Sequence, residues 1–120
     1  MKVAFTAGGE TLESPFDNRF GRAEKFIIYD TDSDTFEVLD NTQNLQAVQG
    51  AGVQSAQHIV DSGVKELVTG NLGPKAAQVI FAAGIAVYHA NAETVAEALA
   101  MYKSKAIKPL KGATVEEHWV

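Results

Sequence analysis

Short apolar runs alternate with glycine-rich or polar breaks along most of the chain, a pattern typical of an α/β protein. A polar, acidic turn at residues 31–34 separates two β-prone runs, which predicts an antiparallel hairpin. Residues 8–24 are predicted to be a long loop, or a loop with one helical turn. The predicted strands cover residues 3–6, 26–29, 36–39, 64–69 and 85–88.

Apolar positions recur with helical spacing in three segments of the second half of the chain. The first segment ends at Gly63, since glycine is the usual residue just past a helix end. Pro74 opens the second, because proline suits a first helical position, and Gly84 ends it. The third is predicted over residues 92–105, with Asn91 as its N-cap.

This order of elements predicts one α/β domain over residues 1–105 with a mixed sheet, parallel in its second half, and helices on both faces. Residues 106–120 are predicted to be a loosely docked tail. The loops after the first, fourth and fifth strands should meet at the carboxyl edge of the sheet. A ligand site is expected there, on residues 6–20, 70–74 and 89–91.

Composition and charge narrow the range of functions. The net charge of −5 argues against nucleic-acid binding, which needs a basic surface. No apolar run approaches the roughly 18–20 residues of a membrane span, and no signal peptide precedes the first strand, so we expect a cytoplasmic protein without membrane contact. The lack of cysteine excludes disulfides, thiolate zinc sites, cysteine-ligated iron–sulfur clusters and cysteine nucleophiles.

Charged and titratable residues give few signs of catalysis. Residues 30–40 hold five acids and no base, and residues 93–111 hold four lysines against two glutamates; both are typical of solvated faces. Of the three histidines, only His89 is predicted to lie at the carboxyl edge, where it could ligate a metal, bind an anion or simply end a strand. We find no nucleophile–base pair and no carboxylate pair in a credible cleft, which predicts a protein that is not an enzyme.

Two glycine clusters precede predicted helices, Gly50-Ala51-Gly52 and Gly70-Asn71-Leu72-Gly73-Pro74. Small residues let a ligand approach the backbone, and the free N–H groups and partial positive charge of a helix start suit an anion. Neither cluster is a Walker loop, because the Gly-x-x-x-x-Gly-Lys-Ser/Thr spacing is absent from both and no hydroxyl residue follows Lys75 to hold magnesium. Tight turns and helix caps explain both clusters equally well.

The chain's only two arginines, Arg19 and Arg22, flank Phe20 and Gly21. The planar guanidinium donates in fixed directions and suits anions with several oxygen or sulfur atoms. Together with Phe16, this loop is predicted to offer a cationic rim and an apolar wall to a ligand. Ordinary surface salt bridges are the alternative.

Taken in order, these motifs resemble those of the dinitrogenase iron–molybdenum cofactor biosynthesis and binding family. The resemblance covers about residues 1–105 and begins with Ser14-Pro15 and Phe20-Gly21-Arg22-Ala23, followed by the two glycine clusters. It implies a ribonuclease-H-like three-layer α/β/α sandwich with a mixed five-stranded sheet, strand two antiparallel. One family member of this size holds a molybdenum–copper sulfide cluster without covalent attachment. A cysteine-free chain fits such a cargo, because metals already saturated by inorganic sulfide need no thiolate.

The resemblance therefore implies a non-enzymatic carrier for an anionic metal–sulfur cluster, either molybdenum–copper sulfide or another molybdenum- or iron–sulfur cluster, with partner proteins in its delivery. One alternative is a regulatory module that binds a phosphorylated metabolite or nucleotide at the helix starts. Another is a protein-interaction domain that docks through the hairpin acids and the lysine-bearing last helix. His89 is the candidate metal ligand. The expected cluster-binding residues are Ser14, Phe16, Arg19, Phe20, Gly21, Arg22, Gly50, Ala51, Gly52, Asn71, Gly73, Pro74 and Lys75.

Overall fold

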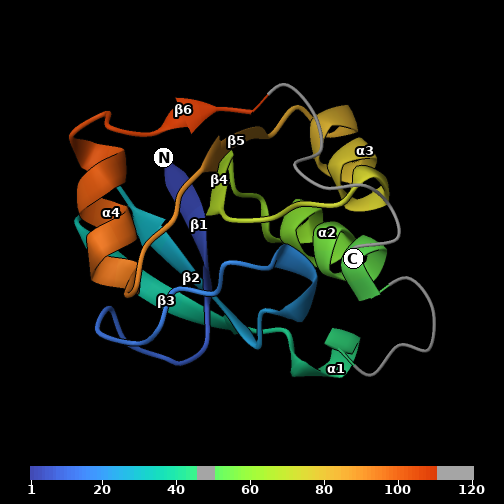
Figure 1. Ribbon diagram of the computed structural model, residues 1–120, viewed down its shortest axis with the longest axis horizontal. Coiled ribbons are helices and arrows are strands. Elements are labelled where there is room, and N and C mark those ends of the chain that lie inside the picture. Colours follow the sequence, from blue (N-terminus) through green and yellow to red (C-terminus); the bar gives the residue numbers. More distant parts are fainter. Residues whose placement is uncertain (46–50, 111–120) are drawn as a thin grey trace.

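A computed structural model describes residues 1–45 and 51–110 (Figure 1). Its strands form one mixed sheet in the order β3-β2-β1-β4-β5-β6. β1, β4 and β5 are parallel, β2 is antiparallel to β1 and β3, and β6 is antiparallel to β5. The strands are β1 (Lys2–Ala7), β2 (Lys25–Asp30), β3 (Thr35–Asp40), β4 (Glu66–Thr69), β5 (Ala86–His89) and β6 (Lys108–Pro109).

Helices cover both faces of this sheet and complete a ribonuclease-H-like three-layer sandwich (Figure 1). α2 (Ala51–Ser62) and α3 (Pro74–Ala82) pack side by side on one face, and α4 (Val95–Lys103) packs on the other. The short helices η1 (Phe20–Arg22) and α1 (Thr42–Leu45) lie in the loops on either side of the β2–β3 hairpin. None of the helices within the described ranges has the length and apolar character needed to cross a bilayer.

Each central strand supplies side chains to two separate cores, because neighbouring side chains point to opposite faces. The core under α2 and α3 takes Ala4, Phe26, Ile28, Leu67 and Val87 from the strands. The core under α4 takes Val3, Phe5, Ile27, Tyr29 and Val68. Burial on both faces explains why these strands are nearly continuous apolar runs in the sequence.

A small polar cluster ties α4 to the sheet. The hydroxyl groups of Tyr102, on α4, and Tyr88, on β5, both donate to the carboxylate of Glu66 on β4. The two rings meet edge to face, with centroids 5.8 Å apart. Burial, and then the hydrogen bond to Glu66, raise the pKa of the Tyr102 hydroxyl. Both tyrosines therefore stay protonated donors at neutral pH.

The predicted fold class and antiparallel second strand are confirmed, but the sheet has six strands where five were predicted. The additional strand is the short β6, which pairs Tyr88 with Pro109 and His89 with Lys108. Next to it, the Leu110 amide donates to the Val87 carbonyl at 2.7 Å. Two residues are too few to show an alternation of apolar and polar side chains, so the sequence pattern did not predict this strand. Residues 111–120 of the predicted tail lie outside the described residues.

The predicted start of the last helix is wrong. Thr94, not Asn91, is the N-cap of α4, and its hydroxyl oxygen accepts from the Glu97 amide at 3.1 Å. Threonine with glutamate three residues later is a strong helix-start signal, and it outweighs an isolated asparagine. Residues 91–93 instead run beside the loop that follows β1, where the Phe16 amide donates to the Glu93 carbonyl at 3.0 Å.

Candidate functional site

The loops after β1 and β4 meet at the carboxyl edge of the sheet, as predicted. The Asn71 amide donates to the Asn18 carbonyl at 2.6 Å, and the Phe20 amide donates to the Asn71 carbonyl at 3.0 Å. Arg19 forms a parallel β-bridge with Asn71. Residues 18–22, called the arginine turn below, are therefore attached to the end of β4 through the backbone.

The same loop also contacts the segment between β5 and α4. The Val95 amide donates to the Ser14 carbonyl at 3.0 Å, and Pro15 forms a β-bridge with Thr94. Ser14 and Phe16 consequently lie on the α4 side, whereas the arginine turn lies toward α2 (Figure 1). The structure thus divides the predicted site between the two faces of the sheet.

Small residues bring the arginine turn against the start of α2, and the start of α2 against α3. A Cβ atom placed on Gly21 would lie 3.5 Å from the Cα of Gly52, and one placed on Gly52 would lie 3.7 Å from the Cβ of Ala76. These are van der Waals contact distances, so the turn touches the start of α2, and the start of α2 touches the first turn of α3. Three motifs far apart in the sequence therefore share one surface.

The two phenylalanines of the loop do not form the exposed apolar wall that was expected. Phe20 is 1% exposed and stacks on Phe26 in the core under α2 and α3, with ring centroids 5.7 Å apart. Phe16 is 4% exposed and belongs to the core under α4. These rings anchor the loop to both cores, and a role in ligand binding stays a prediction.

Both arginine side chains are exposed. Within residues 1–45 and 51–110, neither Arg19 nor Arg22 forms a side-chain hydrogen bond or an ion pair. The adjacent carboxylate, Asp17, accepts from the backbone amide of Arg19 at 2.9 Å. The arginine turn therefore presents two positive charges that no described acid neutralises.

The start of α3 adds the positive end of its helix dipole to this surface. Gly73 is the N-cap and has no side chain to cap the helix, and Pro74 follows as the first helical residue. The amides of the first turn are therefore without a side-chain acceptor from the N-cap. Asn71 and Lys75 are exposed on either side of this start. Ala51 begins α2, whereas Gly50 lies outside the described residues.

The five acids of the β2–β3 hairpin, unlike the two arginines, all have cations beside them. Each one lies within 4 Å of a cation, at distances of 2.8 to 3.7 Å. The pairs are Asp30 and Asp32 with the N-terminal ammonium, Asp34 with Lys103, Glu37 with Lys2, and Asp40 with Lys25. The acidic strip is thus balanced by this chain's own bases.

His58 and His89 do not form a metal centre with other described residues, and His118 lies outside the described residues. His89 is exposed and pairs in the sheet with Thr69 and Lys108. Nowhere in the described part of the chain do three or more His, Cys, Asp or Glu residues come together in a way that could hold a metal ion. The Nδ1 atom of His58 is 3.1 Å from the Oδ1 atom of the buried Asn41, which assigns His58 a packing role. Metal ligation by His89 stays a prediction.

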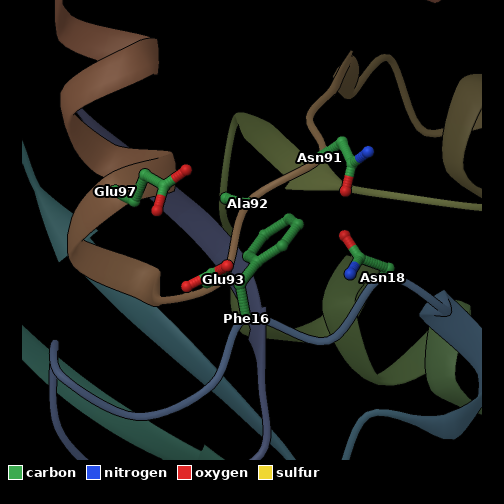
Figure 2. A pocket seen from close by; sticks show the side chains of 6 residues that line it. All are labelled: Phe16, Asn18, Asn91, Ala92, Glu93 and Glu97. Carbon is green, nitrogen blue, oxygen red and sulfur yellow. The ribbon is translucent and has the colours of Figure 1, made fainter.

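A hollow of about 480 Å³ opens beside the arginine turn, on the α4 side (Figure 2). Asn18 and Asn91 face each other across it, with the ring of Phe16 beside them. Glu93 and Glu97 complete the lining with two carboxylates, so this hollow would repel an anion. In the sequence, the signal for this hollow is that Asn91 lies in the loop after β5, one of the loops where a ligand site was expected. An anionic ligand instead suits the surface between the arginine turn and the starts of α2 and α3.

Comparison with known proteins gives consistent results. The family model described as dinitrogenase iron–molybdenum cofactor matches residues 1–105. An uncharacterized protein of Methanocaldococcus jannaschii is 34% identical over 105 residues, which is 85% of either chain. The apo form of the orange protein from Desulfovibrio gigas superposes with a TM-score of 0.90 at 35% identity, covering 95% of this chain and 96% of the other. A NifB-like protein from Thermotoga, of the DUF35 family, gives 0.83 at 37% identity, with 95% and 97% covered.

Proposed function

Because this chain belongs to the dinitrogenase iron–molybdenum cofactor family, we propose that it binds and carries an anionic metal–sulfur cluster and does not catalyse a reaction. The observation that carries the proposal is the pair of exposed arginines without a described partner, on a turn that touches the start of α2 and is hydrogen-bonded to Asn71, just before α3. Guanidinium groups and the positive end of a helix dipole both favour negative charge. Their position on one surface supports noncovalent capture of an anion.

The chemistry of the residues suits a cluster whose metals are already coordinated. The chain has no cysteine, and the described residues hold no set of three potential metal ligands. Arg19, Arg22 and the positive end of the α3 helix dipole would neutralise charge, and the two guanidinium groups would donate to sulfide, without bonding to a metal. We therefore propose molybdenum–copper sulfide as the cargo, with another molybdenum- or iron–sulfur cluster as the alternative.

The ion pairs of the structure also bear on the two alternative functions, binding of a phosphorylated ligand and docking of a partner protein. A phosphorylated metabolite or nucleotide would use the same helix starts and arginines, so it stays the second candidate. Docking of a partner protein through the hairpin acids and the last helix has less support. Asp34 of the hairpin and Lys103 of α4 already pair with each other at 3.1 Å, so each reduces the other's charge toward a partner.

The decisive experiment adds tetrathiomolybdate and copper to the purified protein under anaerobic conditions, followed by desalting, visible absorption and metal analysis. The wild type should keep its colour with a fixed molybdenum and copper content per chain. The variant Arg19→Ala/Arg22→Ala should retain at least about tenfold less, the equivalent of losing about one charged hydrogen bond. The charge-matched control Lys2→Ala/Lys65→Ala removes two lysines at the opposite end of β1 and β4 and should behave as wild type.

Each outcome has a definite meaning. A wild type that remains colourless and metal-free would remove the molybdenum–copper version. Equal retention by the arginine variant and the wild type would overturn the role given to the arginine turn. Binding of a phosphorylated nucleotide that inorganic phosphate displaces, combined with no response to tetrathiomolybdate, would favour the second candidate.

A further inference from the structure

We propose that Gly70 is the residue that positions the arginine turn, because only a residue without a side chain allows the turn to cross the end of β4. The inference rests on the proposed function, since it concerns how Arg19 and Arg22 are held for their ligand. Gly70 directly follows the last residue of β4 and is buried. The family resemblance concerns the glycine cluster as a whole and does not indicate this contact.

The steric case rests on the backbone of Asn18. A Cβ atom on Gly70 would overlap the Asn18 carbonyl oxygen and would lie 2.7 Å from both its carbonyl carbon and its Cα. Real Cβ atoms do not approach other heavy atoms this closely. The obstacle is a main chain, so no side-chain rotation can relieve the overlap. A methyl group at position 70 must therefore push the Asn18 peptide away from β4.

Conformational freedom is not the reason for glycine here. In the described part of the chain, the glycines with positive φ are Gly63 and Gly84. Gly70 is not one of them, so its φ lies outside the left-handed region that alanine rarely adopts. The need for glycine at this position is therefore a matter of space.

The displaced peptide is the one that holds the arginines. The hydrogen bond from the Asn71 amide to Asn18 lies directly beside Gly70, and Phe20 donates back to the Asn71 carbonyl. The Arg22 amide donates to the Arg19 carbonyl at 3.1 Å, so the two arginines move as one unit. A shift of the Asn18 peptide would thus change where both guanidinium groups project relative to the starts of α2 and α3.

Two alanine variants test the proposal. Gly70→Ala adds the overlapping methyl, whereas Gly8→Ala is the matched control. A Cβ at position 8, in the same loop, meets only ordinary contacts of 3.8 Å with Pro15. The assay measures retention of molybdenum and copper after addition of tetrathiomolybdate and copper. Gly70→Ala should retain at least about tenfold less than wild type, and Gly8→Ala should match wild type.

A double-mutant cycle distinguishes positioning from general destabilisation. In the Arg19→Ala/Arg22→Ala background, Gly70→Ala should cause no further loss of retention, because the groups it misplaces are absent. An equal further loss in that background would overturn the proposal. So would retention by Gly70→Ala equal to that of wild type.

Amide hydrogen exchange of the metal-free protein provides a readout that does not need the cluster. Gly70→Ala should speed exchange at the Asn71 and Phe20 amides and leave the β2–β3 amides unchanged. Unchanged protection at both amides would overturn the inference, whether or not the wild type binds a cluster. A wild type that binds no cluster would overturn the proposed function alone. If Gly70→Ala does not fold, Asn71→Pro, which removes the amide donor to Asn18 together with the Asn71 side chain, is compared with Asn71→Ala, which removes the side chain alone. The proline variant should retain less than the alanine variant, and equal retention by the two would overturn the proposal.

Discussion

The β2–β3 hairpin and the arginine turn both carry concentrated charge, but among the described residues only the hairpin charges have partners of opposite sign. All five hairpin acids lie next to a base from β1, β2, α4 or the N-terminus. Arg19 and Arg22 have no such partner among the residues that the structure describes. The number of like charges in a sequence segment therefore does not mark a binding surface. What distinguishes the two regions is whether the charges are paired in three dimensions.

The two regions also differ in how they are attached to the fold. The hairpin lies at the edge of the sheet, and Phe36 on β3 is 40% exposed. The arginine turn sits on a buried ring, Phe20, and on backbone hydrogen bonds to Asn71. A turn anchored in this way, whose charges have no partner in residues 1–45 and 51–110, is suited to bind an anion without first becoming ordered.

The largest expected effect comes from removing the anchor of the arginine turn. Phe20→Ala deletes a ring that is 1% exposed and stacked on Phe26. It should lower the free energy of unfolding by about 3–5 kcal/mol, measured by urea denaturation. On the hairpin, Phe36→Ala should cost under about 0.5 kcal/mol. Similar losses for the two variants would mean that the turn is no better anchored than the hairpin.

Much of the fold could be predicted from the sequence, because its core strands are buried on both faces and its helices end at clear signals. Gly63 and Gly84, with φ of 80° and 77°, follow α2 and α3 as expected. The two-residue β6 could not be predicted, because it depends on pairing with Val87 and its neighbours on β5 and not on an alternating pattern in its own residues.

The candidate site was predictable as a set of loops but not as a set of contacts. The order of strands brought the arginine turn and the Asn71 loop to one edge. The division of the loop between two cores depends on the burial of Phe16 and Phe20, which aromatic residues in a polar loop do not reveal. The crossing of Asn18 over Gly70 joins residues far apart in the chain, and no local signal encodes it.

A smaller effect is expected where α4 meets the hairpin. Lys103 pairs with Asp34 at 3.1 Å and lies over the ring of Tyr29, 5.0 Å from its centroid. Lys103→Ala should lower the free energy of unfolding by up to about 1 kcal/mol, because both partners are largely exposed and screened. The loss should shrink when denaturation is repeated at high salt. A loss that does not depend on salt would indicate that packing of the lysine stem, and not charge, joins the two elements.

The pH dependence of the hairpin should be smaller still. Hydrogen bonds from the Thr42 amide and hydroxyl, and then Lys25, lower the pKa of Asp40 to about 2. A lowered carboxyl pKa stabilises the folded state above the unfolded value of 3.8, and the contribution disappears as the pH falls toward 2. The difference in Tm between wild type and Asp40→Asn should therefore be constant at neutral pH and vanish between roughly pH 4 and 2. Glu10→Gln, at an exposed position, is the control, and a difference that persists at pH 2 would contradict the assigned pairing.

The smallest expected effect on stability is at the arginine turn itself. Arg19→Ala/Arg22→Ala should leave the free energy of unfolding within about 0.5 kcal/mol of wild type, since the guanidinium groups have no described partner to lose. Lys25→Ala is the matched comparison, because it removes a half-buried cation that pairs with Asp40 at 3.3 Å and should destabilise more. A loss above about 1 kcal/mol for the arginine variant would mean that its charges hold the fold together. Reduced cluster retention could then reflect unfolding, whereas unchanged stability with lost retention can only reflect the ligand.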